Sequence, residues 1–226
     1  FRLDPVESAS IEIDDLLPVY LLTSPPDETV RDPDDPNVHY FPTGEVHEVG
    51  VLEVGPHETV YIEGGAVLRG AIHAADADGV AIRGHGILDG SPYAKPHGKR
   101  SIFLENGRDV TVEDITMINP SGWMLVLGGC ENVRINGLKQ IGECVNSDGI
   151  DVVGSHHVRI SNCFMRNNDD CVVLKAKKLG AADSTDHDWR QDVRDVRVES
   201  CTFFNAHAGN AMEIGFELWA ESVTDV

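Results

Sequence analysis

The chain has 226 residues, about one and a half domains of roughly 150 residues each and enough to bury a substantial core. Hydrophobic residues make up 41% of it, and 18 lysines and arginines against 38 acids give a net charge of −20. That balance argues against nucleic acid and anionic membrane surfaces as partners, because both require a basic face. No apolar run approaches the roughly 20 residues that span a bilayer, so we expect no membrane-embedded helix.

The N-terminal part of the chain differs from the rest. Residues 11–22 have the pattern of a strand, and residues 23–37 are rich in proline and aspartate, which is typical of turns and linkers. We therefore expect a small β segment with a linker over residues 1–37 and the main domain over residues 38–226. The chain begins in mid-pattern without a signal peptide, which indicates that the native N-terminus is missing.

Two repeated sequence motifs dominate the main domain. The first starts with a valine and then alternates polar and apolar residues, and it begins at Val80, Val110, Val133, Val158, Val196 and Val223. The second aligns four apolar residues, Leu125, Ile150, Val172 and Met212. Short β-rich runs separated by glycine, asparagine and aspartate turns, at a period near 25 residues, are typical of a parallel β solenoid. We therefore predict an all-β fold in which the valines from Val110 to Val196 stack in the interior.

The same register predicts the environment of the cysteines. The five cysteines have no CxxC spacing and no neighbouring histidine cluster, which argues against zinc. Cys163 and Cys201 fall where Ile115 and Leu138 lie on earlier coils, so we expect small buried residues there. The last residues stop inside a new coil, which predicts a truncated C-terminus because an open solenoid end exposes strand edges.

A row of polar and aromatic residues precedes the second motif. Two positions before each of its apolar markers stand Trp123, Asp148, Asp170 and Asn210, with Asp169 beside Asp170. Coils stack about 4.8 Å apart, so these side chains should open into one groove with Trp123 at its end. Carboxylates that close raise at least one pKa, which lets one acid hold a proton while another is ionised. General acid and base catalysis of glycoside hydrolysis needs this arrangement, although an aspartate-rich chain also builds plain turn ladders.

Two acidic blocks carry a family resemblance. Residues 146–151, Asn-Ser-Asp-Gly-Ile-Asp, followed by residues 168–172, Asn-Asp-Asp-Cys-Val, resemble glycoside hydrolase family 28, the polygalacturonase group. Residues 84–90, Gly-His-Gly-Ile-Leu-Asp-Gly, resemble an early coil of that family. The resemblance covers roughly residues 36–226. It implies a right-handed parallel β-helix and an inverting polysaccharide hydrolase with a pectin-type substrate, either galacturonan or rhamnogalacturonan.

The resemblance also implies roles for the three acids. Asp169 would be the general acid, and Asp148 and Asp170 would activate the attacking water. Inverting carboxylates usually lie about 6.5–9.5 Å apart, whereas stacked coils are about 4.8 Å apart, so the side chains must splay. No cofactor and no metal is implied. The partner would be a polysaccharide, and the location would be secreted or otherwise extracytoplasmic.

The sequence departs from the family pattern in one block. Where the family has Gly-His-Gly, this chain has Gly209-Asn210-Ala211, and Glu213 follows with another charge. The family's later Arg-Ile-Lys motif, which grips uronate carboxylates, would lie beyond residue 226. A neutral α-glucan therefore stays open as substrate, as in glycoside hydrolase family 49, which contains dextranases and isopullulanase.

Further side chains are candidates for substrate binding. They are Asn146, Trp123, Lys175, Asn210, Glu213 and Trp189. Trp123 would stack on a sugar ring or pack between coils. Lys175 would bind a uronate or pair with an acid, and Trp189 lies in an insertion over residues 176–193 that we expect to form a cleft wall. His156 and His157 are expected to face solvent in a turn.

Two other functions remain open from the sequence. A β-helix polysaccharide lyase or epimerase would use aspartates to bind Ca²⁺ and a base to remove a proton beside a uronate. A solenoid that binds glycans without catalysis would need none of the acids. An unsaturated, ultraviolet-absorbing product that EDTA abolishes would identify the lyase.

Overall fold

The computed structural model describes residues 8–14, 16–27, 32–178, 188–205 and 207–226. The chain divides into two compact units, residues 1–31 and residues 32–226. Within the described residues no helix is long and apolar enough to cross a membrane.

The first unit contains one antiparallel pair of short strands. β1 (Ala9–Ile11) pairs with β2 (Val19–Leu21), with Ala9 opposite Leu21. The sequence predicted one strand over residues 11–22, and the structure has the two short strands β1 and β2 instead. Asp14, with a φ of 45°, lies in the connection and supplies the left-handed conformation that a short polar residue tolerates.

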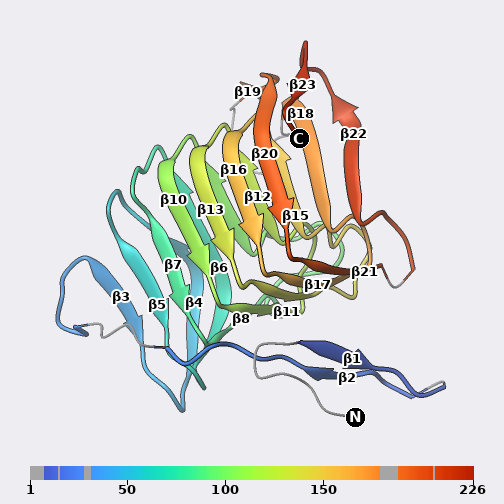
Figure 1. Cartoon of the computed structure of the whole chain (residues 1–226). Coiled ribbons are helices and arrows are strands. Elements are labelled where there is room, and N and C mark those ends of the chain that lie inside the picture. The colour runs from blue at the N-terminus through green and yellow to red at the C-terminus, as the bar shows by residue number, and fades with distance from the viewer. Residues whose placement is uncertain (1–7, 15, 28–31, 179–187, 206) are drawn as a thin grey trace. The chain divides into compact units, whose positions relative to one another are not determined.

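The second unit consists of stacked coils that form two large sheets (Figure 1). The first sheet contains β3 (Val38–Phe41), β5 (Thr59–Ile62), β7 (Ala81–Gly84), β10 (Arg108–Glu113), β13 (Glu131–Asn136), β16 (His156–Ser161), β20 (Val193–Glu199) and β23 (Val223–Thr224). Its strand pairs are parallel throughout. Each strand therefore lies one coil away from its neighbour in the sheet.

The second sheet covers the other two faces of the coils. It contains β4 (Val46–Glu53), β6 (Val67–Ala75), β8 (Ile87–Asp89), β9 (Ile102–Glu105), β11 (Thr116–Ile118), β12 (Leu125–Gly128), β14 (Lys139–Ile141), β15 (Ile150–Val153), β17 (Phe164–Asn167), β18 (Val172–Lys178), β19 (Asp188–Trp189), β21 (Thr202–Asn205) and β22 (Met212–Leu218). Only β19 pairs antiparallel, with β18, among the described strands of this sheet. The fold is the predicted right-handed parallel β-helix.

The corner between these two faces changes along the solenoid. β6 passes through it as one strand that pairs first with β8 and then with β9. The strand bends at Gly70, where φ is +148° and a Cβ would lie 2.2 Å from the backbone oxygen of Gly50. In later coils the corner is a loop, such as residues 119–124 between β11 and β12 or residues 142–149 between β14 and β15. These loops are free to project polar side chains, and the candidate site lies there.

The predicted valine ladder is confirmed. Val110, Val133, Val158 and Val196 lie opposite one another on successive coils, and each is at most 2% exposed. The predicted alignment of Val223 with Val196 is wrong. Val223 lies opposite Val193, and the backbone N–H of Val196 donates to the carbonyl of Asp225. The Val-x-Asp-Val spacing occurs in both coils, so the sequence pattern allowed either valine of the last coil to be aligned.

The interior stack of small and aliphatic residues is confirmed as well. Ile115, Leu138 and Cys163 are buried, and Cys201 is half-buried at the next coil. All five cysteines are free. The interior is thus filled by aliphatic side chains and thiols at matching positions, and no disulfide contributes to its stability.

A second ladder, called the turn ladder below, runs near the start of four strands of the first sheet. Asp109, Asn132, His157 and Asp195 occupy equivalent positions on β10, β13, β16 and β20, and each has a φ between 51° and 57°. Asparagine and aspartate adopt this left-handed conformation more easily than most residues, and histidine is also enriched there. The local twist breaks the alternation of side chains at this turn.

Candidate active site

Successive corner loops hold the predicted row in register. The backbone N–H of Met124 donates to the carbonyl of Asp148 at 2.8 Å, and that of Gly149 donates to the carbonyl of Asp170 at 2.8 Å. The N–H of Cys171 donates to the carbonyl of Asn210 at 2.9 Å. These bonds continue the parallel ladder beyond the strand ends. The stacked alignment of the row is therefore confirmed.

The row opens into a pocket of about 340 Å³. Its lining consists of Trp123, Asn146, Asp148, Asp169, Asp170, Lys175, Gly209, Asn210, Glu213, Phe216 and Glu217. One carboxylate oxygen from each of the three aspartates lies within 4.8 Å of the other two. The nearest oxygens are thus closer than the roughly 6.5–9.5 Å between the carboxyl groups of an inverting pair, and the splaying that the sequence analysis expected is not found between these oxygens. All three aspartates line one concave surface. An active site requires this arrangement, whereas a row of turn aspartates with a purely structural role does not.

Asp169 and Asp170 differ in their surroundings although they are neighbours in sequence. Asp169 is half-buried, and its Oδ1 accepts a hydrogen bond from the backbone N–H of Asp170 at 3.0 Å. Asp170 is buried, and its Oδ1 accepts from the backbone N–H of Asn210 at 2.7 Å and from Asn210 Nδ2 at 3.3 Å. Asn210, which replaces the histidine of the family pattern, therefore orients Asp170 and also contacts Glu213 through Nδ2.

Asp148 forms part of a buried charged cluster. Lys175 Nζ donates to Asp148 Oδ2 at 2.9 Å and to Asp151 Oδ1 at 2.7 Å, and the side chains of all three are at most 4% exposed. Glu217 Oε2 lies 3.7 Å from the same nitrogen, and Trp123 places its ring centroid 3.7 Å from it. Of the two roles that the sequence left open for Lys175, pairing with acids is the one that the structure has.

Two buried carboxylates share this one lysine, which determines their protonation. Burial and then the charge of Asp151 raise the pKa of Asp148 to about 8, against the opposing effect of Lys175. Burial raises the pKa of Asp151 to about 6, again opposed by Lys175. Burial lowers the pKa of Lys175, but the two carboxylates outweigh it and leave that pKa above its ordinary value. Asp148 therefore keeps its proton to a higher pH than an ordinary aspartate.

This cluster predicts how stability depends on pH. The folded pKa values of Asp148 and Asp151, about 8 and about 6, lie above the ordinary value of 3.8, so the fold holds protons that the unfolded chain releases. Their contribution is complete below pH 4 and is lost as the pH rises towards 8. We expect Asp148→Asn to reduce the fall in unfolding free energy between pH 5 and pH 8, measured by urea unfolding. A fall equal to that of the wild type would contradict the raised pKa of Asp148.

Gly209 supports the aspartate pair from the next coil. Its φ is +81°, and a Cβ there would lie 2.2 Å from the carbonyl carbon of Asp169 and 2.4 Å from the nitrogen of Asp170. A side chain at this position must therefore push the Asp169-Asp170 backbone away from the pocket. The site depends on a glycine here for a steric reason that is separate from the conformation of Gly209 itself.

We expect Gly209→Ala to lower kcat about tenfold or more, because a 1 Å misplacement of catalytic groups costs up to about 10²-fold. Gly44→Ala is the matched control, because Gly44 has a φ of +82° with no atom within 4 Å of its would-be Cβ. The comparison of kcat values separates displacement of the aspartates from backbone strain. An equal effect of both substitutions would contradict the steric explanation.

Trp189 does not line the acidic pocket, so its expected contact with substrate is corrected here, whereas the cleft wall expected of the whole insertion stays a prediction. β19 pairs with the end of β18, with Trp189 opposite Lys177, which folds the indole back over the outer face of the sheet. Trp189 is 2% exposed, donates from Nε1 to Asn106 Oδ1 at 3.0 Å and meets Phe103 edge to face at 5.9 Å. The middle of the predicted insertion, residues 179–187, lies outside the described residues.

The other predicted residues all line the pocket, in different settings. Asn146 and Glu213 are half-buried, and Asn210 is exposed. Trp123 is half-buried and packs against the cluster that contains Trp189. Trp123 therefore combines the two roles that the sequence analysis weighed, since it packs between coils and also borders the pocket.

Sequence reasoning missed several residues of the site. Asp151 ends the first acidic block. It lies opposite Val173 in the repeat register, so alternation along the next strand places it on the same face as Lys175. Arg100 carries no such signal; its guanidinium lies 5.0 Å from the Trp123 ring centroid. A second hollow of about 340 Å³ is lined by His97, Arg100 and Lys177 and shares Trp123, Asn146 and Glu217 with the acidic pocket. The acidic row thus has a neighbour that contains two cations and one acid.

Sequence comparison relates the chain to one family. The profile described as "Glycosyl hydrolases family 28" matches residues 64–214, more than half of the chain. A polygalacturonase from Chamaecyparis obtusa is 36% identical over 76 residues, which are 33% of this chain and 15% of that protein. A polygalacturonase from Juniperus ashei is 30% identical over 121 residues, which are 46% of this chain and 24% of that protein. The chain therefore spans less than a quarter of either relative.

Solved structures with the same fold are more distant in sequence. The family 28 exopolygalacturonase of Yersinia enterocolitica superposes with a TM-score of 0.59 at 18% identity, over 80% of this chain and 47% of that one. The endo-xylogalacturonan hydrolase of Aspergillus tubingensis superposes with a TM-score of 0.58 at 20% identity, over 84% of this chain and 63% of that one. At these identities the likeness shows the fold alone.

Proposed function

This chain belongs to glycosyl hydrolases family 28, and we propose that it hydrolyses glycosidic bonds in an acidic, pectin-type polysaccharide. The observation that carries the proposal is the meeting of three carboxylates from consecutive coils in one pocket, with an oxygen of each within 4.8 Å of the others. The activity would reside in residues 38–226. A polymer substrate of this kind does not cross membranes, which supports a secreted or extracytoplasmic location.

Each aspartate has a role that its surroundings support. Asp169 is the most accessible of the three and donates a proton to the glycosidic oxygen as general acid. Asp148 and Asp170, on adjacent coils, hold the water that attacks the anomeric carbon from the opposite side, which inverts its configuration. Asn210 keeps Asp170 oriented through two hydrogen bonds to Oδ1.

Asp148 is well suited to accept the proton of that water. Its Oδ2 is held by Lys175, whereas its buried Oδ1 has no hydrogen-bond partner among the described residues. A carboxylate whose pKa is raised to about 8 is a stronger base than an ordinary aspartate once it is ionised. Lys175 therefore acts as a positioning residue and not as a ligand of the substrate carboxylate.

The basic hollow next to the pocket supports an anionic sugar chain. His97, Arg100 and Lys177 line it, and it shares Trp123 with the acidic pocket. Glu217 also lines this hollow and pairs with Lys177 at 2.7 Å, so the net positive charge of the hollow comes from Arg100, and a carboxylate of a uronate chain would be attracted there. A uronate polymer fits this pair of hollows better than a neutral α-glucan, and so takes precedence over the family 49-like alternative.

The test is product analysis with the full protein on polygalacturonic acid, rhamnogalacturonan and dextran. We expect new reducing ends from a uronate polymer, a first product of inverted anomeric configuration by NMR, and no effect of EDTA. Cleavage of dextran alone would favour the glucanase. An unsaturated product that EDTA abolishes would favour the lyase, and binding without cleavage would favour a glycan-binding solenoid.

A further inference from the structure

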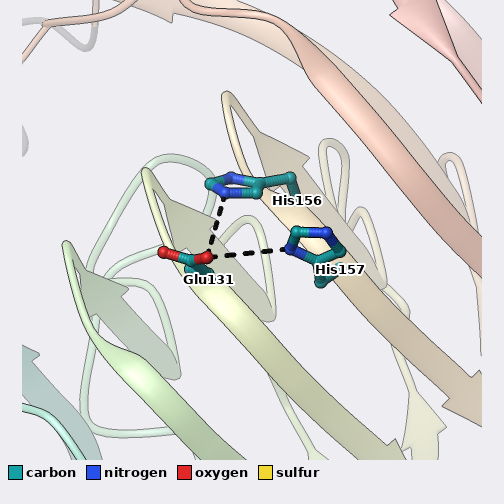
Figure 2. Close-up of side chains that lie close together, drawn as sticks. All are labelled: Glu131, His156 and His157. Carbon is teal, nitrogen blue, oxygen red and sulfur yellow. Dashed lines mark ion pairs between the residues drawn. The ribbon is translucent and has the colours of Figure 1, made fainter.

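A second cluster of polar side chains lies on the first sheet, apart from the acidic pocket. Glu131 begins β13 and lies opposite His156, the first residue of β16, with His157 next in the chain. Figure 2 shows both imidazoles directed at the carboxylate of Glu131. His156 Nε2 lies 3.5 Å and His157 Nδ1 lies 3.8 Å from the same oxygen, Glu131 Oε1. No residue of this cluster lines the acidic pocket.

The backbone of the turn ladder is what brings the two histidines together. Neighbouring side chains on a regular strand point to opposite faces of the sheet. The left-handed φ of 54° at His157 interrupts this alternation, and the two rings come to lie 4.9 Å apart between centroids. Adjacent histidines thus approach a carboxylate of the neighbouring coil from one side.

We propose that Glu131, His156 and His157 bind one divalent transition-metal ion of the zinc class. Zinc–nitrogen and zinc–oxygen bonds of about 2.0–2.2 Å in a tetrahedron place ligand atoms roughly 3.4 Å apart. The separations of 3.5 and 3.8 Å approach that value, and one donor atom of each residue lies within 4.8 Å of the other two. Two imidazoles and one carboxylate suit zinc, copper or nickel, whereas Mg²⁺ and Ca²⁺ prefer oxygen ligands.

The surroundings of the cluster provide the support that metal ligands need. Because His157 directs Nδ1 at Glu131, its other nitrogen, Nε2, faces Asp195 Oδ2 at 3.9 Å. Arg159 holds that aspartate through a 2.9 Å contact to Oδ1. The 3.9 Å contact is longer than a hydrogen bond, and Arg159 also donates to Asp195 Oδ2 at 3.2 Å, so the aspartate acts on His157 through its charge. Access is open, because Glu131, His157 and Asp195 line a hollow of about 520 Å³, together with Arg108 and Arg159, whose side chains pair with Glu131 and Asp195.

One neighbour competes for the carboxylate, but at its other oxygen. Arg108 Nε lies 3.5 Å from Glu131 Oε2, in a half-exposed pair that leaves Oε1 directed at the histidines. Exposed pairs of this kind contribute little to stability and give way readily. A bound ion would join two consecutive coils, β13 and β16, and so would stabilise the solenoid against unfolding.

The experiment titrates the chelator-treated full protein with Zn²⁺ and with Co²⁺. We expect one equivalent bound with a raised melting temperature, visible d–d absorption of bound Co²⁺, and no competition by Mg²⁺ or Ca²⁺. His156→Gln, His157→Asn and Glu131→Gln should each weaken Zn²⁺ binding at least about tenfold. Asn is chosen at position 157 because Asn132 adopts the same left-handed conformation one coil earlier, at a φ of 54°.

Two control variants locate the ion. His39→Gln removes a histidine that pairs with a single carboxylate, Glu58, at 2.8 Å on the same sheet, and should leave Zn²⁺ affinity unchanged. Asp169→Asn alters the acidic pocket, the other cluster that could collect a cation. Loss of binding in Asp169→Asn but not in the three cluster variants would overturn the proposal, as would the absence of saturable Zn²⁺ binding to the wild type.

Discussion

Replacing Asp169 by asparagine is expected to lower kcat by about 10²- to 10⁴-fold, the usual contribution of a general acid. The asparagine keeps the size of the side chain, and its oxygen still accepts the 3.0 Å hydrogen bond from the backbone of Asp170. Only the transferable proton is lost. Binding of a non-cleaved oligogalacturonide should therefore stay unchanged while turnover on polygalacturonic acid collapses, as measured by release of reducing ends.

Asp114→Asn serves as the control for this variant. Asp114 has a φ of 63° in a turn of the solenoid, where asparagine is equally tolerated, and it does not line the acidic pocket. Its kcat should match that of the wild type. Turnover near the wild-type rate in Asp169→Asn would exclude Asp169 as the acid, and activity lost equally in both variants would point to the fold instead.

The parallel coils could be predicted because the apolar residues that fill the interior recur at a regular spacing in the sequence. A valine or a second apolar marker recurs at each coil, so stacking follows from periodicity without any knowledge of distant contacts. The same spacing aligned Asp148, Asp170 and Asn210, because each of them stands two residues before an apolar residue that stacks with its equivalent on the next coil. One interval was ambiguous, and there the alignment of Val223 was wrong by three residues.

The repeat pattern could not predict the position of inserted segments or the direction of long side chains. Trp189 belongs to an insertion, and no interior register fixes the direction in which an inserted segment folds back. Lys175 does lie in register, but its side chain length allows it to reach either solvent or an acid. The direction of the Lys175 side chain depends on its contact with Asp151 and on burial by neighbouring side chains. These are tertiary contacts that the spacing of residues does not predict.

Lys175 and its two carboxylates also show how the site restricts the fold. Lys175 supplies one positive charge for Asp148 and Asp151, whose buried oxygens Asp148 Oδ1 and Asp151 Oδ2 have no hydrogen-bond partner among the described residues. A solenoid optimised for stability alone would fill these positions with apolar residues, since buried charges are costly even when paired. The cluster is consistent with a need for a strong base at Asp148, in line with the proposed hydrolysis.

Lys175→Met is therefore expected to lower the free energy of unfolding by about 3–5 kcal/mol at pH 8, because it removes the cation that opposes the raised pKa of both buried carboxylates. Asp148 and Asp151 must then either stay charged in the core or bind protons that the unfolded chain releases. The loss should be smaller at pH 5, where both already hold protons in the wild type. The direction follows from their raised pKa values of about 8 and about 6, whose stabilising contribution disappears as the pH rises. Urea unfolding at both pH values measures the difference.

Lys177→Met is the matched control, since Lys177 has the same side chain on the same strand and pairs with Glu217 at 2.7 Å but is 19% exposed. Its loss should stay within about 1 kcal/mol at either pH, as for other accessible ion pairs. The double variant Lys175→Met with Asp151→Asn should recover part of the stability, because it removes one of the two buried carboxylates that have lost this cation. A loss in Lys175→Met that is equal at pH 5 and pH 8 would instead assign the effect to packing of the lysine side chain against Trp123.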